Sequence, residues 1–258
     1  MTEIPVRQFR GRDGLPLAYH EIGGPGAGRP LILIHGYTGS AAWSWIESGI
    51  ADRMAARGYR VIMPDLRGHG GSSRPHDAAA YPPDALADDG LALIEQLGLD
   101  DYDLGGYSLG GRTVIRLLAR GATPRRAVAA GQGLEAVAGA SQRGDNYRRL
   151  FRGFGTFEPG SPERGMQDWI TSSGGDPAAL VRVLDTQVDT SLDELARVTV
   201  PTLIMTGAED GHDRTAEALA RALPAGRYLQ LPGNHLTASQ APEFEAALAA
   251  FLAGADPS

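Results

Sequence analysis

The chain has 258 residues, of which 42% are hydrophobic and 21% are charged, proportions that exclude a disordered or fibrous protein and predict a folded domain with a sizeable core. Its formal net charge is −7, whereas nucleic-acid-binding surfaces are basic, so we expect a small neutral or weakly charged ligand and no nucleic acid. Cysteine and lysine are both absent, which excludes disulfides, thiolate nucleophiles, zinc–sulfur sites, lysine Schiff bases and Walker A phosphate loops.

The first half of the chain alternates between predicted strands and helices. Residues 5–11 and 17–23 alternate polar and apolar side chains around the turn RDGLP, which predicts a β-hairpin. The run PLILIHG is continuously apolar from Leu31 to Ile34, as is typical of a strand covered on both faces. Further strands are predicted at 59–65, 102–106 and 125–131, and helices at 41–57, 83–97 and 109–121. This alternation predicts a mostly parallel sheet with helices on both faces.

The regular pattern stops after residue 131 and resumes near residue 196. The intervening stretch carries the turn-rich strings GFGTFEPGSPERG and SSGGDP between two or three helical pieces, so we interpret residues 132–195 as an insertion. The later predicted strands lie at 198–207 and 226–233, and the later helices at 213–222 and 240–253. The sequence therefore predicts an α/β core domain formed by residues 1–131 and 196–258.

No targeting or membrane signal is visible in the sequence. The N-terminal string MTEIPVRQFRGRDG lacks the basic-then-apolar pattern of a signal peptide, and no apolar run is long enough to cross a bilayer. We therefore expect a cytoplasmic protein with no membrane partner.

The string GGYSLGG at positions 105–111 contains the spacing G-x-S-x-G, formed by Gly106, Ser108 and Gly110. In a nucleophile elbow, a serine occupies a sharp strand-to-helix turn, and glycines two residues away let neighbouring backbone approach without Cβ clashes. The motif is weak by itself, but here it follows an apolar strand and opens a helix, as an elbow requires. A dinucleotide-binding turn is disfavoured because the first strand-to-helix turn lacks G-x-G-x-x-G spacing.

A serine hydroxyl needs a base, most often a histidine that is itself oriented by a carboxylate. His235 lies in the string LPGNHL, directly after the last predicted strand and at the same end of the sheet as Ser108. Asp210 lies in the loop GAEDGHD after the preceding strand. The chain order serine, aspartate, histidine is that of one hydrolase class. The other acidic candidates are Glu135, Glu209 and Asp213.

Attack on a carbonyl group creates an oxyanion, which preplaced backbone donors must stabilise. The N–H group of Leu109, directly after the nucleophile, is one expected donor. The N–H group of Tyr37, in the loop that follows the strand LILI, is the other. The string HGYTGS is also typical of a turn into a helix capped by Ser40, and the two interpretations are compatible.

These motifs together resemble the α/β-hydrolase family over nearly the whole chain. HGYTGS resembles the family's oxyanion loop, PDLRGHGGSS the loop after the next strand, GAED the acid loop and PGNH the histidine loop. The resemblance implies an eight-stranded sheet and a short helical cap at residues 132–195. Asn234 departs from the family pattern, because many members carry glycine directly before the histidine.

Membership of this family leaves the reaction open, because the fold hosts many functions. Relatives that open epoxides or displace halides carry aspartate at the elbow, so Ser108 favours acyl transfer. We expect a carboxylesterase that cleaves small to medium esters through an acyl-enzyme, as a monomer or homodimer, with no metal or organic cofactor. A lactonase, a C–C bond hydrolase or a cofactor-free perhydrolase has the same triad, and a ligand-binding sensor on a hydrolase fold is an alternative of another class.

The predicted cap and the segment after the oxyanion loop supply many large apolar side chains, which favour an apolar acyl or alcohol group. The expected substrate contacts are Trp43, Leu134, Tyr147, Phe151, Phe154 and Trp169, with Trp45, Leu150, Phe157 and Met166 as further apolar residues. Packing of the cap itself explains the same residues equally well. The cap arginines either hold an anionic substrate or form the solvated face of the cap helices; they are Arg143, Arg148, Arg149, Arg152 and Arg164.

Overall fold

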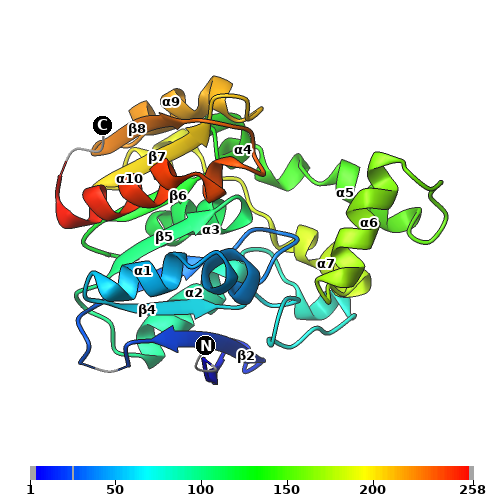
Figure 1. Ribbon diagram of the computed structural model, residues 1–258, viewed down its shortest axis with the longest axis horizontal. Helices are drawn as coiled ribbons and strands as arrows, with labels where there is room; N and C mark the ends of the chain where they lie inside the picture. The colour runs from blue at the N-terminus through cyan, green and yellow to red at the C-terminus, as the bar shows by residue number, and fades with distance from the viewer. Residues whose placement is uncertain (1–3, 25, 256–258) are drawn as a thin grey trace.

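Within residues 4–24 and 26–255, the part of the chain that the computed structural model describes, eight strands form one sheet (Figure 1). The strands are β1 (Val6–Arg10), β2 (Pro16–Ile22), β3 (Arg29–Ile34), β4 (Tyr59–Pro64), β5 (Asp103–Tyr107), β6 (Ala127–Ala130), β7 (Thr202–Gly207) and β8 (Gly226–Leu231). Their order across the sheet is β1-β2-β4-β3-β5-β6-β7-β8. The pairs β1–β2 and β2–β4 are antiparallel, and all later pairs are parallel. The predicted mostly parallel, eight-stranded α/β sheet is therefore confirmed.

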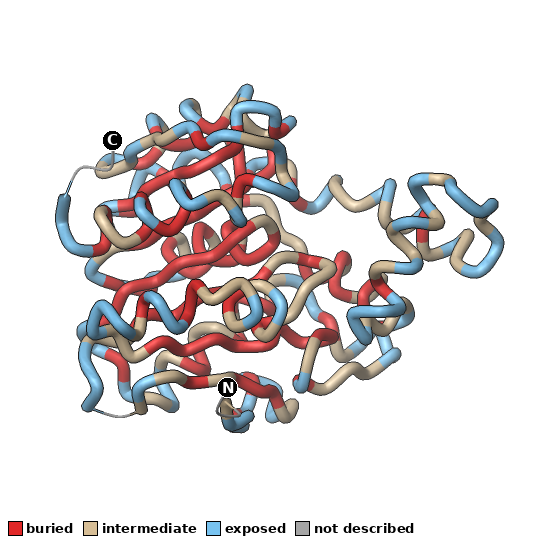
Figure 2. The backbone as a smooth tube through the Cα atoms, viewed as in Figure 1, coloured by how far each residue is buried: buried red, intermediate tan, exposed pale blue. Residues whose placement is uncertain are grey.

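Side chains along the central strands alternate between two hydrophobic clusters, one on each face of the sheet. The helices that cover these faces are α1 (Ile50–Ala56), α2 (Ala85–Gln96), α3 (Leu109–Ala119), α9 (Asp213–Ala222) and α10 (Pro242–Ala253). Leu31 and Leu33 of β3 belong to the cluster with α1 and α10, whereas Ile32 and Ile34 belong to the cluster with α2, α3 and α9. Figure 2 shows the resulting burial of the strands. No helix in the described ranges has both the length and the apolarity needed to span a bilayer.

The helical stretch predicted over residues 41–57 is present but divided in two. Residues Ala42–Glu47 form a short π-helical segment, and α1 begins at Ile50. Gly49 separates the two segments with a φ of 75°, a left-handed conformation that helices do not contain and that glycine adopts without a Cβ penalty. The glycine therefore ends the first segment and lets the second begin in a new direction.

The segment between β6 and β7 contains helices and no strand among its residues, all of which are described. The helices are α4 (Leu134–Ala138), α5 (Asp145–Arg152), α6 (Pro162–Ser172), α7 (Pro177–Val183) and α8 (Leu192–Leu195). In Figure 1, α5, α6 and α7 project beyond the end of the sheet. More helices form than the two or three expected, because the turn-rich strings contain helix starts: the side chains of Ser161 and Asp176 cap α6 and α7.

Candidate active site

Ser108 lies at a strained turn between β5 and α3. Its backbone φ of 56° and ψ of −118° are unfavourable for a residue with a Cβ atom. Both flanking glycines are required: a Cβ on Gly106 would lie 2.5 Å from the carbonyl carbon of Gly110, and a Cβ on Gly110 would lie 2.0 Å from the carbonyl oxygen of Ile34. This is the geometry that a nucleophile elbow needs in order to expose its hydroxyl at the end of a sheet.

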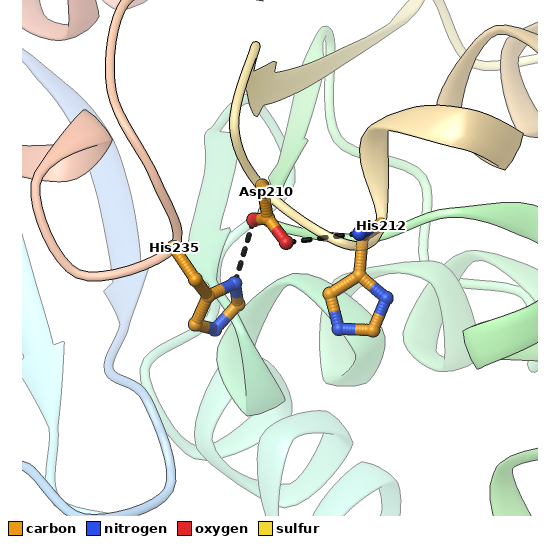
Figure 3. Close-up of side chains that lie close together, drawn as sticks. All are labelled: Asp210, His212 and His235. Atoms are coloured by element: carbon orange, nitrogen blue, oxygen red, sulfur yellow. Dashed lines mark hydrogen bonds and ion pairs between the residues drawn. The ribbon is translucent and has the colours of Figure 1, made fainter.

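The structure brings Asp210, His235 and Ser108 into one hydrogen-bonded chain. Asp210 follows β7 and His235 follows β8, so both lie at the edge of the sheet where Ser108 follows β5. The Nδ1 atom of His235 lies 2.7 Å from Oδ2 of Asp210, and its Nε2 atom lies 2.9 Å from Oγ of Ser108. When Nδ1–H donates to the carboxylate, Nε2 is left to accept the serine proton. Figure 3 shows the Asp210 carboxylate reaching His235 on one side and the backbone nitrogen of His212 on the other.

The carboxylate of Asp210 is nearly inaccessible, with 2% of the side chain exposed. Burial raises the pKa of this carboxyl group, but the hydrogen bonds from His235 and from the backbone N–H of His212 outweigh burial and hold the pKa below its usual value. The group is therefore ionised at neutral pH, and it can stabilise a protonated imidazole.

The other acidic candidates make different contacts. Glu135 and Glu209 are exposed to solvent. Asp213 accepts a hydrogen bond of 2.9 Å from the hydroxyl of Thr206. Of the four predicted carboxylates, Asp210 is the one that contacts the imidazole.

Two backbone amides next to Ser108 are available as oxyanion donors. The loop after β3 lies against the nucleophile, since a Cβ on Gly36 would be 3.4 Å from the Cβ of Ser108. The amide of Tyr37 follows Gly36 in this loop, and the amide of Leu109 is the first of α3. Neither amide donates a hydrogen bond to another group in residues 4–24 and 26–255. Both are therefore free for the role predicted for them.

Two side chains that the sequence motifs do not single out hold the serine and the histidine in place. The side-chain amide of Gln132, which is buried, donates to the carbonyl oxygen of Ser108 at 2.7 Å. The hydroxyl of Tyr107 donates to the carbonyl oxygen of His235, also at 2.7 Å. The only sequence signal is that Tyr107 precedes the nucleophile and that Gln132 follows β6, so these contacts become visible only in the fold.

The loop after β4 fastens the oxyanion loop through buried polar side chains. Asp65 accepts hydrogen bonds from the backbone N–H groups of Ala41 and Gly71, both at 2.8 Å. The Nε2 atom of His69 lies 2.5 Å from the carbonyl oxygen of Tyr37. The polar residues Asp65 and His69 of the string PDLRGHGGSS therefore have a structural role, because their hydrogen bonds hold the backbone that carries the Tyr37 amide.

We expect Asp65→Asn to lower the free energy of unfolding by about 2 kcal/mol at pH 7. The N–H groups of Ala41 and Gly71 bond to different carboxylate oxygens, and an asparagine replaces one of these oxygens with an NH₂ group. Burial raises the pKa of Asp65, but contacts with His20 and with backbone amides outweigh burial and hold the pKa below its usual range. A lowered pKa stabilises the fold above about pH 3.9, the usual pKa of an aspartate, and this contribution is lost as the pH falls further. Urea unfolding at pH 7 and pH 3 measures the difference between variant and parent, which should shrink at pH 3.

The control for this measurement is Asp52→Asn, which alters an exposed carboxylate and should leave stability unchanged at both pH values. A difference between Asp65→Asn and the parent that stays constant from pH 7 to pH 3 would contradict the predicted role of the ionised carboxylate.

A cavity of about 1130 Å³ lies beside Ser108 and His235, and both residues line it. A small molecule that enters this cavity can therefore reach the hydroxyl of Ser108. Three of the predicted substrate contacts, Trp43, Tyr147 and Trp169, also line the cavity. The rings of Trp43 and Trp169 have centroids 4.8 Å apart, so the π-helical segment Ala42–Glu47 and helix α6 meet at this aromatic pair.

Leu134, Phe151 and Phe154 lie elsewhere. These three residues are absent from the cavity lining and pack against the hydrophobic cluster on the α2 and α3 side of the sheet. The rings of Phe151 and Tyr37 have centroids 6.4 Å apart. The structure shows packing contacts for these residues, and their contact with substrate stays a prediction.

The five cap arginines are also absent from the cavity lining. Arg148 pairs with Asp185 at 2.9 Å, and Arg164 pairs with Asp168 at 2.8 Å. These surface pairs favour the interpretation that the arginines form the solvated face of the cap over the interpretation that they hold an anionic substrate.

Asp210, His212 and His235 are also a group that could hold a metal ion. Each residue offers one ligand atom, and these atoms lie within 4.8 Å of one another. Burial lowers the pKa of His212 to about 4, so its ring is uncharged at neutral pH, the form that binds transition metals.

Comparison with known proteins identifies the family. The model of the alpha/beta hydrolase fold matches residues 29–135. A non-heme haloperoxidase from Rhodococcus erythropolis is 30% identical over 229 residues, which cover 77% of this chain and 80% of that protein. The chain belongs to the α/β-hydrolase family.

Its α/β-hydrolase relatives differ in activity. A 2-hydroxymuconate semialdehyde hydrolase from Pseudomonas sp. strain CF600 is 35% identical over 135 residues, which are 48% of this chain and 47% of that protein. A putative aryl esterase from Burkholderia cenocepacia superposes with a TM-score of 0.74 at 25% identity, over 96% of this chain and 98% of that one. The first curated relatives are matched over only 34% to 47% of their own length. Family membership alone therefore leaves the substrate of this α/β-hydrolase open.

Proposed function

We propose that this α/β-hydrolase is a serine carboxylesterase for small to medium esters. Ser108 attacks the ester carbonyl, His235 takes the hydroxyl proton and returns it to the leaving alcohol, and Asp210 holds the imidazole in its Nδ1–H form. The backbone amides of Tyr37 and Leu109 stabilise the oxyanion. Water then attacks the acyl-enzyme with His235 again acting as the base, and the carboxylic acid leaves.

The observation that carries this proposal is the unbroken hydrogen-bonded chain from Asp210 through His235 to Ser108. A serine at the elbow favours acyl transfer, because its oxygen forms an ester with the acyl group and is regenerated when water hydrolyses that ester. The similarity to a putative aryl esterase over 96% of the chain agrees with ester cleavage.

We further infer that residues 132–195 act as a cap on a core domain formed by residues 1–131 and 196–258. Tyr147 of α5 and Trp169 of α6 line the cavity beside Ser108. The hydroxyl of Tyr37 donates to a carbonyl oxygen in α7 at 2.6 Å, which ties this segment to the oxyanion loop. A cap in this position shapes the part of the cavity that receives the acyl or alcohol group of the substrate.

Perhydrolysis is a second candidate, favoured by the 30% identity to a non-heme haloperoxidase. In this reaction hydrogen peroxide replaces water, attacks the acyl-enzyme on Ser108 and leaves as a peroxy acid, so the same triad and amides serve both reactions. Lactone hydrolysis also passes through this acyl-enzyme, and C–C bond hydrolysis shares the triad. Ester hydrolysis and perhydrolysis therefore differ in whether water or hydrogen peroxide attacks the same acyl-enzyme, and measuring this competition distinguishes them.

A panel of p-nitrophenyl esters, with acyl chains from acetate to palmitate, tests the proposal. We expect turnover with the highest kcat/KM on short and medium chains, because the cavity has the size of a pocket for a drug-sized molecule. A phosphonate ester inhibitor should leave a single covalent adduct, located on Ser108 by mass spectrometry. Ester binding without turnover and without an adduct would make the protein a sensor, and peroxy acid formation that outpaces hydrolysis would favour the second candidate.

A further inference from the structure

A second histidine, His212, lies beside the catalytic pair. Its ring centroid is 5.4 Å from that of His235, and its backbone N–H donates to Oδ1 of Asp210 at 2.9 Å. The residue is partly exposed, and its ring makes no hydrogen bond to another group in the described ranges. The ring of His212 has no role in the esterase mechanism, although Figure 3 shows it near the carboxylate of Asp210, which orients His235.

We propose that Asp210, His212 and His235 form an inhibitory binding site for Zn²⁺ and similar transition-metal ions. This proposal rests on the proposed function, because inhibition presupposes that His235 is the base. A carboxylate with two imidazoles is a ligand set that zinc accepts, and a water molecule completes the tetrahedron.

The ligand atoms are close to the separation that zinc requires. They lie within 4.8 Å of one another, whereas zinc bonds of about 2.0–2.2 Å place two tetrahedral ligand atoms about 3.4 Å apart. Rotation of the partly exposed His212 ring, which no hydrogen bond holds, brings its nitrogen toward the carboxylate. Arg112 and Arg143 act electrostatically on this ring and oppose a cation, so we expect weaker binding than at a structural zinc site.

Metal binding would inactivate the base by changing its tautomer. Zn²⁺ takes the lone pair on Nδ1 of His235, the atom that faces Asp210, and the single ring proton moves from Nδ1 to Nε2. The Nε2 atom, 2.9 Å from Oγ of Ser108, then donates a hydrogen bond and cannot accept the serine proton. The metal leaves the cavity open, so substrate still binds and KM is unchanged, whereas the loss of the base lowers kcat. The ring keeps its single proton, so no net proton is released.

Zn²⁺ titration of p-nitrophenyl butyrate hydrolysis tests this site. We expect the parent to keep about a tenth of its kcat when Zn²⁺ is at ten times its dissociation constant, with KM unchanged and with recovery after EDTA. His212→Phe keeps the ring beside His235 and the backbone N–H to Asp210 but has no ring nitrogen. Its Zn²⁺ inhibition, measured against its own uninhibited rate, should be weakened by at least about 10-fold. Mg²⁺, which prefers oxygen ligands, should not inhibit.

Co²⁺ binding, followed by its visible absorption, keeps this proposal separate from the esterase proposal, because it needs no turnover. We expect an absorption band in the parent, its loss in His212→Phe, and its retention in His76→Asn, which removes an exposed histidine. Three outcomes would overturn the proposal: equal Zn²⁺ sensitivity of the parent and His212→Phe, a rise in KM at constant kcat, or no Co²⁺ band in the parent.

Discussion

Replacing Ser108 by alanine is expected to lower kcat by about 10⁶, the largest effect of any single change proposed for this protein. The substitution removes only the Oγ atom that His235 contacts at 2.9 Å. The cavity and the two oxyanion amides remain, so the substrate still binds and KM changes little. Residual turnover then comes from oxyanion stabilisation and binding alone. Steady-state hydrolysis of p-nitrophenyl butyrate measures the loss.

Loss of activity in this variant must be separated from loss of fold. Alanine has a Cβ atom like serine, so the strained φ of 56° is retained and we expect an unchanged Tm. Ser44→Ala removes another serine that lines the same cavity and should leave kcat at the parental value. Parental turnover by Ser108→Ala would end the serine-hydrolase proposal.

The sheet was predictable because its central strands carry continuous apolar runs. Ile32 and Leu33 pack into different clusters on the two faces of the sheet, and both clusters are covered by helices, so the run shows no polar alternation. The interruption at Gly49 was not predictable, because the flanking residues are helical and a single glycine is tolerated within a helix. The helices between β6 and β7 outnumber the two or three that the sequence predicts, because the N-cap residues Ser161 and Asp176 lie in strings whose glycines and prolines also favour turns.

Some features of the candidate site could also be predicted from the sequence, and others could not. Ser108, Asp210 and His235 each follow a predicted strand, and parallel strands bring their carboxyl ends to one edge of the sheet, so their approach could be expected from chain order. The contact from Gln132 to the backbone of the nucleophile has no motif, because it depends on how the loop after β6 folds back. The substrate contact of Phe151 stays a prediction, because an apolar helix face does not reveal whether it faces a cavity or a core; in the fold Phe151 packs against the hydrophobic cluster.

Asp210→Asn is expected to lower kcat by about 10⁴ while leaving the fold intact. Oδ1 of Asp210 accepts the backbone N–H of His212 at 2.9 Å, so the carbonyl oxygen of an asparagine takes that position and its NH₂ group faces Nδ1 of His235. Nδ1 must then accept a hydrogen bond, and the ring proton moves to Nε2. In this tautomer His235 donates to Ser108 and cannot act as its base.

The matched control is Asp213→Asn at the start of α9. The carboxylate of Asp213 accepts from Thr206 instead of a histidine, so its replacement should leave kcat close to the parental value. The pKa of Asp210 lies below the usual aspartate value of about 3.9, so protonation of this group does not limit the parent at higher pH. The loss in Asp210→Asn should therefore persist across the whole pH–rate profile above that value. A parental kcat in Asp210→Asn would mean that another group orients the imidazole, and a larger loss in Asp213→Asn would transfer that role to Asp213.

The Asp210→Asn substitution and Zn²⁺ bound to Nδ1 impose the same tautomer on His235. The Asp210→Asn variant has therefore already lost the activity that Zn²⁺ would remove, and added Zn²⁺ should lower its kcat little further.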